Sequence, residues 1–137
     1  MCARYVVGVT PKVSNQTLMR RLLGASVAAA DAEQFEVSYH ALMAALHAAE
    51  IVGRDTGSVA PLDEIERVAK AQAAMVEKVK PPHQLSKSAA KNRGHNSVYE
   101  TLLIHTKSAR LRIEAEARRD NTVFRWPNVR YGEVSNG

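Results

Sequence analysis

Between Glu33 and Arg54 the polar residues fall into one narrow stripe along a predicted helix. Successive members are three, four or seven residues apart, and Met43 fills the gap at the centre. An α-helix repeats every 3.6 residues, so side chains at these steps share one face. Almost every other position is apolar or small, which is typical of a helix that other helices surround. The pattern therefore predicts a central helix. Its polar stripe consists of Glu33, Glu36, His40, His47, Glu50 and Arg54.

A first helix is predicted ahead of the central one. Ser14 belongs to the residue types that cap helix N-termini, and apolar or small residues then recur at helical spacing. Asp31 is expected to separate the two helices, although nothing in residues 28–30 prevents one continuous helix. The face expected to point inward consists of Leu18, Leu22, Ala25 and Ala29.

A loop and a third helix are predicted after the central helix. Glycine, proline and small polar residues indicate the loop at residues 53–61. An amphipathic pattern then predicts a helix over residues 62–79, which Pro81 and Pro82 end because proline cannot continue a helix. Residues 80–96 are expected to form a long polar connection with one turn of helix inside it.

The fourth helix is marked by a capping box, in which Ser97 and Glu100 satisfy each other's backbone N–H groups. It should therefore start at Val98, and we expect it to end near residue 120. Its expected inner stripe is Val98, Leu102, His105, Ala109, Ile113 and Ala117.

Four helices with apolar faces predict an all-α fold, an antiparallel four-helix bundle with irregular or short extended termini. A chain of 137 residues has the size of a single domain. We expect its core at about residues 14–120 and a tail at 121–137. The β-prone residues 5–9 could pair with that tail as a small ribbon.

Composition narrows the class of protein. Hydrophobic residues make up 45% of the chain and charged residues 24%, values typical of a soluble globular protein. Cys2 is the sole cysteine, which excludes an intrachain disulfide, and no apolar run approaches the length of a membrane span. We therefore expect a cytoplasmic protein that does not engage a membrane. A central helix this apolar needs covering on most sides, which favours a homo-oligomer.

Positive charge is concentrated in the second half of the chain. Residues 1–77 carry seven Lys/Arg against nine Asp/Glu, whereas residues 78–137 carry twelve against five. Residues 78–99 contain no acidic residue at all. Lysine and arginine bind phosphate backbones, so this half predicts nucleic acid or another polyanion as a partner. The candidate anion-binding residues are Lys80, Lys87, Lys91, Arg93, Lys107 and Arg110.

The polar stripe of the central helix suggests a weaker candidate, a metal site that would use His40, His47 and Glu50. Helical bundles build metal sites from carboxylates and imidazoles at helical spacing. The two histidines are, however, about 10 Å apart along the axis at 1.5 Å per residue, too far to share one ion. A solvated stripe is therefore the favoured interpretation, and no catalytic residue and no cofactor is predicted.

Motifs of well-marked enzyme classes are absent from the sequence. It contains no phosphate loop, no dinucleotide fingerprint, no nucleophile elbow and no Cys-x-x-Cys. His105 on the predicted inner stripe of the fourth helix is interpreted as a buried histidine with a hydrogen-bond partner. An enzyme is therefore the less favoured class.

The run from Ser38 to Glu50 resembles the long tyrosine- and alanine-rich helix of HEPN domains. Those domains are small helical bundles, often dimeric, that occur as RNases and as nucleotidyltransferase partners in toxin–antitoxin systems. The resemblance covers one helix and implies a bundle of that kind. The family's catalytic motif pairs an arginine and a polar residue with a histidine a few positions later. Its nearest counterpart here is residues 91–95, where lysine replaces the arginine, so RNase activity is not implied.

Together these patterns predict a small helical-bundle protein that acts as an interaction or structural module and self-associates. The alternative is a basic nucleic-acid-binding protein that uses residues 78–99 and the fourth helix. A metal-dependent or HEPN-like RNase enzyme is a distant third.

Overall fold

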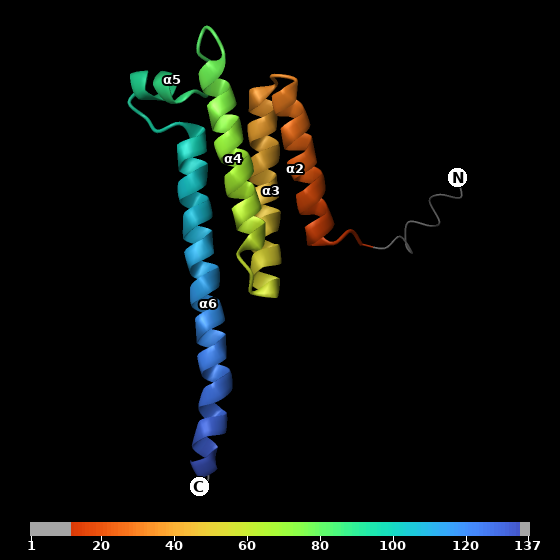
Figure 1. Cartoon of the computed structure of the whole chain (residues 1–137), viewed down its shortest axis with the longest axis vertical. Helices are drawn as coiled ribbons and strands as arrows, with labels where there is room; N and C mark the ends of the chain where they lie inside the picture. Colours follow the sequence, from red (N-terminus) through yellow and green to blue (C-terminus); the bar gives the residue numbers. More distant parts are fainter. Residues whose placement is uncertain (1–11, 135–137) are drawn as a thin grey trace, which may run out of the picture.

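A computed structural model describes residues 12–134 of the chain, with side-chain positions for residues 12–120. These residues form five helices and no strand (Figure 1). The all-α class predicted from the sequence is therefore confirmed. The helices are α2 (Asn15–Asp31), α3 (Phe35–Thr56), α4 (Ala60–Lys78), α5 (Lys87–Asn92) and α6 (Val98–Val134).

The helices α2, α3, α4 and α6 form an antiparallel bundle, in which each runs opposite to the one before it (Figure 1). Both α3 and α4 contact all three other helices of the bundle, and α3 has the most extensive contacts, chiefly with α2. The short helix α5 lies in the connection between α4 and α6 at one end of the bundle, and α6 continues past the opposite end. Consecutive helices joined by few residues must return side by side, which accounts for this topology.

The core lies around α3, as the apolar circumference of that helix predicts. Leu42, Ala45 and Ala49 near its middle are fully buried. Burying a leucine side chain contributes about 1.5 to 3 kcal/mol, so substitutions in this helix should cost most. The neighbouring helices complete the same apolar cluster, with Met19, Leu62, Ile65 and Leu102 among its members.

The buried face of α2 is rotated by one residue position from the predicted face. Leu18 is 39% exposed and Ala25 faces solvent. One position on a helix corresponds to a rotation of about 100°. The predicted face leaves out Ser26, whose hydroxyl is buried and hydrogen-bonded. The buried residues of α2 are Met19, Leu23, Ser26 and Ala30.

Three buried polar side chains join α2, α3 and α4. The Ser26 hydroxyl donates to the Ser38 carbonyl over 2.7 Å, and the Ser38 hydroxyl donates to the Ser26 carbonyl over 2.8 Å. The side-chain amide of Gln72 in α4 donates to Ser26 Oγ over 2.8 Å. Both hydroxyls therefore have partners, as buried polar groups require, and their small side chains bring α2 close to α3. Within the described residues, Gln72 Oε1 has no hydrogen-bond partner.

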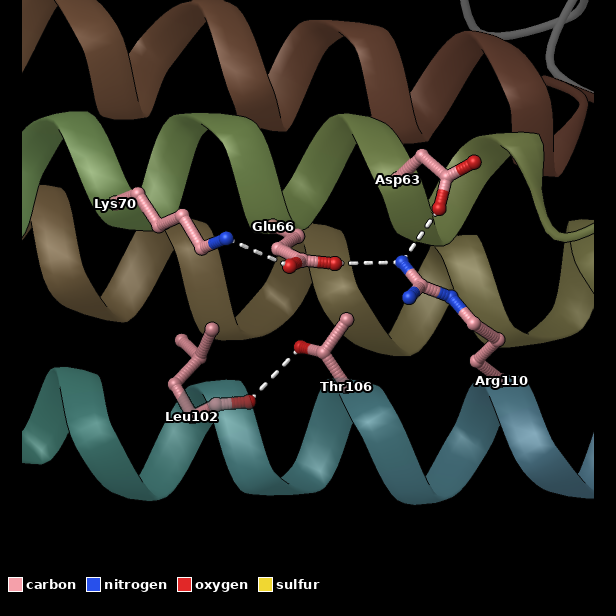
Figure 2. A network of polar contacts seen from close by, with 6 residues as sticks. All are labelled: Asp63, Glu66, Lys70, Leu102, Thr106 and Arg110. Carbon is pink, nitrogen blue, oxygen red and sulfur yellow. Dashed lines mark hydrogen bonds and ion pairs between the residues drawn. The ribbon is translucent and has the colours of Figure 1, made fainter.

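The start of α6 matches the prediction, and so does its buried face except at His105: Leu102, Ala109 and Ile113 are buried as predicted. The Ser97 N–H donates to Glu100 Oε1 over 2.8 Å, and the Glu100 N–H donates to Ser97 Oγ over 3.1 Å, so the capping box is confirmed. His105, however, is exposed, and the next residue, Thr106, is buried in its place. The Thr106 hydroxyl donates to the Leu102 carbonyl over 2.8 Å (Figure 2). That bond within its own helix allows the hydroxyl to be buried without an unpaired polar group.

The predicted end of the last helix is wrong. α6 continues to Val134 instead of ending near residue 120, so residues 121–134 are helical and do not form the predicted ribbon. Residues 5–9, its proposed partner strand, lie outside the described residues. Asp120 and Asn121 are weak helix formers, but they do not break a helix. Although α6 is long, no helix of residues 12–134 has an apolar run sufficient to cross a membrane.

Gly53 lies within α3 and not in the predicted loop, and it sets the contact between α3 and α6. A Cβ at this position would lie 2.7 Å from Ile113 Cδ1 and 2.9 Å from the Ser58 carbonyl oxygen. The helix ends instead at Gly57, whose φ of 69° is a left-handed conformation that glycine adopts easily. The loop is therefore shorter than predicted, and α4 begins at Ala60.

Candidate functional site

The histidines of the α3 polar stripe lie at the surface. His40 and His47 are exposed, and a carboxylate oxygen of the partly buried Glu50 is 4.0 Å from the Arg112 guanidinium of α6. No group of three His, Cys, Asp or Glu side chains in residues 12–120 is placed to hold a metal ion. The three candidate metal ligands therefore do not converge, and the geometry supports the solvated-stripe interpretation.

The connection between α4 and α6 presents three of the predicted anion-binding residues to solvent. Lys80, Lys91 and Arg93 are all exposed. The Arg93 guanidinium donates to the Gln84 carbonyl over 3.3 Å, which ties that side chain to its own connection. Lys87 and Lys107 are exposed as well, so of the six predicted cations all except Arg110 remain open to solvent.

Lys87, in contrast, is placed against carboxylates. Its Nζ is 3.7 Å from the Glu100 carboxylate, and its backbone N–H donates to the Glu77 carboxylate. The hydrogen bond from the Ser97 backbone, with a smaller contribution from Lys87, lowers the pKa of Glu100 below its ordinary value. Residues 78–99 contain no acidic residue, but Glu77 before this stretch and Glu100 after it both contact Lys87 within it.

Arg110, another of the predicted anion-binding residues, is paired with carboxylates of its own chain and is only partly exposed. Figure 2 shows its guanidinium reaching from α6 to α4, 2.5 Å from Asp63 Oδ1 and 2.6 Å from Glu66 Oε1. Lys70 Nζ lies 2.9 Å from the other Glu66 oxygen. Hydrogen bonds from Lys70 and then from Arg110 lower the pKa of Glu66. Lys107, one turn earlier, is exposed. It lies about 14 Å along α6 from the start of that helix at 1.5 Å per residue.

The outer face of α6, directly opposite the core, was missed by the sequence analysis. Ile104 is 59% exposed and Leu111 is 56% exposed. The signal was present in the sequence as a second stripe, in which apolar or small residues recur at steps of three and four. We define the outer face of α6 as Thr101, Ile104, Ser108, Leu111 and Ala115.

A groove of about 350 Å³ lies beside this outer face, between α4 and α6. Its lining combines two apolar side chains with the charged ends of two lysines and of the paired residues Glu66 and Arg110. Mixed apolar and charged linings of this kind are common at the edges of protein–protein contacts. The lining residues are Glu66, Lys70, Leu103, Ile104, Lys107 and Arg110.

A second hollow, of about 630 Å³, lies where α2 faces the corner between α3 and α4. Its lining includes the buried residues Met19, Leu23 and Val52, and it carries the charged residues Arg20 and Glu64. One cation and one carboxylate do not make a metal site or an anion site. This hollow therefore adds no catalytic chemistry.

Tyr99 at the start of α6 is 1% exposed, and its hydroxyl has no hydrogen-bond partner among the described residues. Its ring meets the ring of Tyr39 edge to face, with centroids 5.8 Å apart. Burial, with a smaller contribution from Tyr39, raises the pKa of Tyr99 to about 12. A phenol held this firmly in its neutral form packs α6 against α3 and does not act as a base at neutral pH.

Comparison with known proteins gives no match to a family model, to a curated protein or to a solved structure. The resemblance of residues 38–50 to HEPN helices stays a prediction. What the protein does has to be argued from the described surface.

Proposed function

We propose that the protein is an interaction module that works by self-association, and that the outer face of α6 is the contact surface. The observation that carries this proposal is the pair Ile104 and Leu111, which are 59% and 56% exposed on the side of α6 turned away from the core. Two large apolar side chains one heptad apart on an accessible helix are typical of a helix-to-helix contact.

The structure changes the reason for expecting self-association. The sequence suggested that α3 needs a second chain to cover its apolar circumference. In the fold, α2, α4 and α6 already cover α3, and Leu42 and Leu46 are 0% and 1% exposed. Val37 and Ile51 stay exposed on α3, but among the described residues α6 carries two large apolar side chains that are each more than half exposed on one face, so we place the proposed contact there.

Sedimentation velocity of the parent protein and of Leu111→Glu tests the proposal. We expect the parent to form a species of about 30 kDa, twice the 15.0 kDa chain mass, and the variant to remain a monomer. Val37→Glu is the matched control, because Val37 is 59% exposed but lies on α3. A parent protein that is monomeric at about 100 µM, where even weak specific contacts assemble, would remove the proposal.

Polyanion binding is a second candidate function, which the exposed residues Lys80, Lys91 and Arg93 favour. The sequence contains no recognisable base-reading module, so such a contact would be electrostatic and weakly selective for sequence. The logarithm of the affinity for duplex DNA should then fall with the logarithm of salt concentration by about 0.9 per phosphate neutralised.

Replacing these three cations together by glutamine should flatten the salt slope by about two to three units while leaving the fold intact. Lys70→Gln is the control, because Lys70 Nζ already lies 2.9 Å from the Glu66 carboxylate. Titration of labelled DNA and RNA at two salt concentrations measures the slope. An unchanged slope in the triple variant, or no binding at about 100 mM salt, excludes this candidate.

A further inference from the structure

We propose that the outer face of α6 docks against the same face of a second copy in antiparallel orientation, with the two-fold axis between Ser108 and Leu111. This inference rests on the proposed function, self-association through that face, and adds the orientation and register of the partner. A two-fold contact is self-complementary, so each favourable pair occurs twice. Side-chain size, charge and the neighbouring groove each favour this arrangement.

Large and small side chains match in the antiparallel register. Ile104 lies opposite the partner's Ala115, and Leu111 lies opposite the partner's Ser108. Each large apolar side chain then packs beside a small one, so the two helices can approach closely between Ile104 and Ala115. Parallel pairing would place leucine against leucine and serine against serine, which separates the helices at one layer and leaves the next underfilled.

The charges beside the face favour the same orientation. Antiparallel pairing brings the exposed Lys107 next to Glu114 of the partner subunit. Parallel pairing would bring Lys107 next to Arg112 of the partner subunit, a like-charge contact near the centre of the interface. It would also place Glu114 beside the partner's Arg119, which offsets that repulsion in part. Like-charge contacts select against wrong arrangements more than opposite charges add affinity.

The groove between α4 and α6 provides space for the partner's Glu114. Two of its three cations are already engaged, Lys70 with Glu66 at 2.9 Å and Arg110 with Glu66 at 2.6 Å. The described residues show no ion pair for the third, Lys107, whose side chain is exposed at the groove. A carboxylate from the second copy would complete this charge arrangement.

The expected contact is weak enough to be regulated by concentration. From Thr101 to Ala115 the outer face covers 14 residue steps, or roughly 21 Å at 1.5 Å per residue. Interfaces of this size bury less than the roughly 1,200 to 2,000 Å² of standard specific complexes, so we expect dissociation in roughly the micromolar range. In this arrangement the segments of α6 that continue past each bundle point in opposite directions, which makes the dimer two-ended.

Disulfide cross-linking tests the orientation. In a Cys2→Ser background, the single variants Ile104→Cys and Ala115→Cys are oxidised separately and as a mixture. The antiparallel register predicts a cross-linked dimer in the mixture and little in either protein by itself, because cysteine Cα atoms must lie within about 7 Å. Cross-linking of each variant by itself would show parallel pairing and overturn this inference, although the proposed function would stand.

Reversing the charge at Lys107 tests the orientation independently, because it should change the dimer affinity in opposite directions for antiparallel and parallel pairing. Lys107→Glu should weaken the antiparallel dimer about threefold to tenfold, because it sets two carboxylates opposite each other at both symmetric contacts. It should strengthen a parallel dimer, in which the new carboxylate would face Arg112 of the partner subunit. Adding Glu114→Lys to Lys107→Glu should restore the parent affinity in the antiparallel case.

The outcomes separate this inference from the proposed function. A dimer that Leu111→Glu disrupts but Lys107→Glu strengthens overturns the antiparallel register alone. A parent dimer that neither substitution affects uses another surface and overturns both proposals. A parent protein without a dimer removes the proposed function, and the inference falls with it.

Discussion

The first and last helices of the bundle are attached to their neighbours in different ways. α2 meets α3 through reciprocal hydrogen bonds between the buried residues Ser26 and Ser38, a contact without any ionisable group. α6 meets α4 through Arg110, which lies between Asp63 and Glu66 at an edge that solvent reaches. The first contact should therefore resist changes in salt and pH, whereas the second should respond to both. The responsive side is also the side that carries the proposed interaction surface.

The centre of the bundle and the outer face of α6 should differ most under the same substitution. Leu42→Asp places an unpaired charge at a position that is 0% exposed, at a cost of several kcal/mol, and should unfold the protein. Leu46→Asp should act in the same way, because that residue is 1% exposed. Thermal melting followed by circular dichroism measures the effect.

Ile104→Asp is the counterpart on α6, where the side chain is 59% exposed. It should leave the melting of the monomer almost unchanged. If Leu42→Asp and Leu46→Asp both melt like the parent protein, the assignment of α3 as the central helix is wrong.

The serine contact between α2 and α3 should give the next largest effect. Ser38→Ala removes a hydroxyl that donates over 2.8 Å to the Ser26 carbonyl, and we expect a loss of about 1 to 2 kcal/mol. The Ser26 hydroxyl would still donate to the backbone of residue 38, so the loss stays below the cost of an orphaned group. Urea unfolding measures the difference.

The double variant with Ser26→Ala completes a thermodynamic cycle. The two residues share one network, so their effects should not add. Strict additivity would mean that the two hydroxyls act independently.

Local signals in the sequence were sufficient where a structural feature depends on neighbouring residues. The capping box of Ser97 and Glu100 is complete within four positions, and the start of α6 followed from it. The apolar circumference of α3 is likewise a property of one segment. The all-α bundle could therefore be predicted.

Features that depend on partners far along the chain could not be predicted. Ser26 is buried because its hydroxyl donates to the Ser38 carbonyl and accepts from the Gln72 amide. Gln72 lies 46 residues away in the sequence. Gly53 looks like a loop residue until Ile113 is placed against it. For the same reason Arg110 looked like a free cation, although the fold sets it against Asp63 and Glu66.

The buried phenol at the start of α6 predicts a further effect, which is absent at neutral pH and exceeds that of Ser38→Ala only near pH 12. Folding raises the pKa of Tyr99 from 10.0 to about 12, so the neutral form is favoured in the folded state. The contribution of neutral Tyr99 to the free energy of unfolding is therefore fully present below pH 10.0 and is lost as the pH rises toward 12. The loss should reach about 2 to 3 kcal/mol, since each pKa unit corresponds to about 1.4 kcal/mol.

Tyr99→Phe separates this effect from general alkaline unfolding. The variant should lose most of the pH dependence above pH 10.0. It should also be as stable as the parent or more stable at neutral pH, because it removes a buried hydroxyl without a partner among the described residues. A destabilisation of more than about 1 kcal/mol at pH 7 would show that the hydroxyl has a partner.

The smallest effect is expected at the charged contact between α6 and α4. Arg110→Met removes the guanidinium between Asp63 and Glu66, whose side chains are 59% and 30% exposed. Exposed ion pairs contribute about 0 to 1 kcal/mol, so the loss should stay within that range at low salt. The variant also removes the buried Arg110 Nε, which has no partner among the described residues, and this gain offsets part of the loss.

High salt and low pH should then remove the difference in unfolding free energy between the Arg110→Met variant and the parent protein. The pKa of Glu66 is lowered from 4.5 in the folded state, so its contribution is present above that value and is lost as the pH falls through the lowered pKa. The gap in unfolding free energy should therefore close in about 1 M salt, where the screening length is about 3 Å, and also in acid. Ser38→Ala is the control, because its cost should change under neither condition. A loss above about 2 kcal/mol that persists in high salt would mean that Arg110 is held as a buried pair, and that the two sides of the bundle are attached alike.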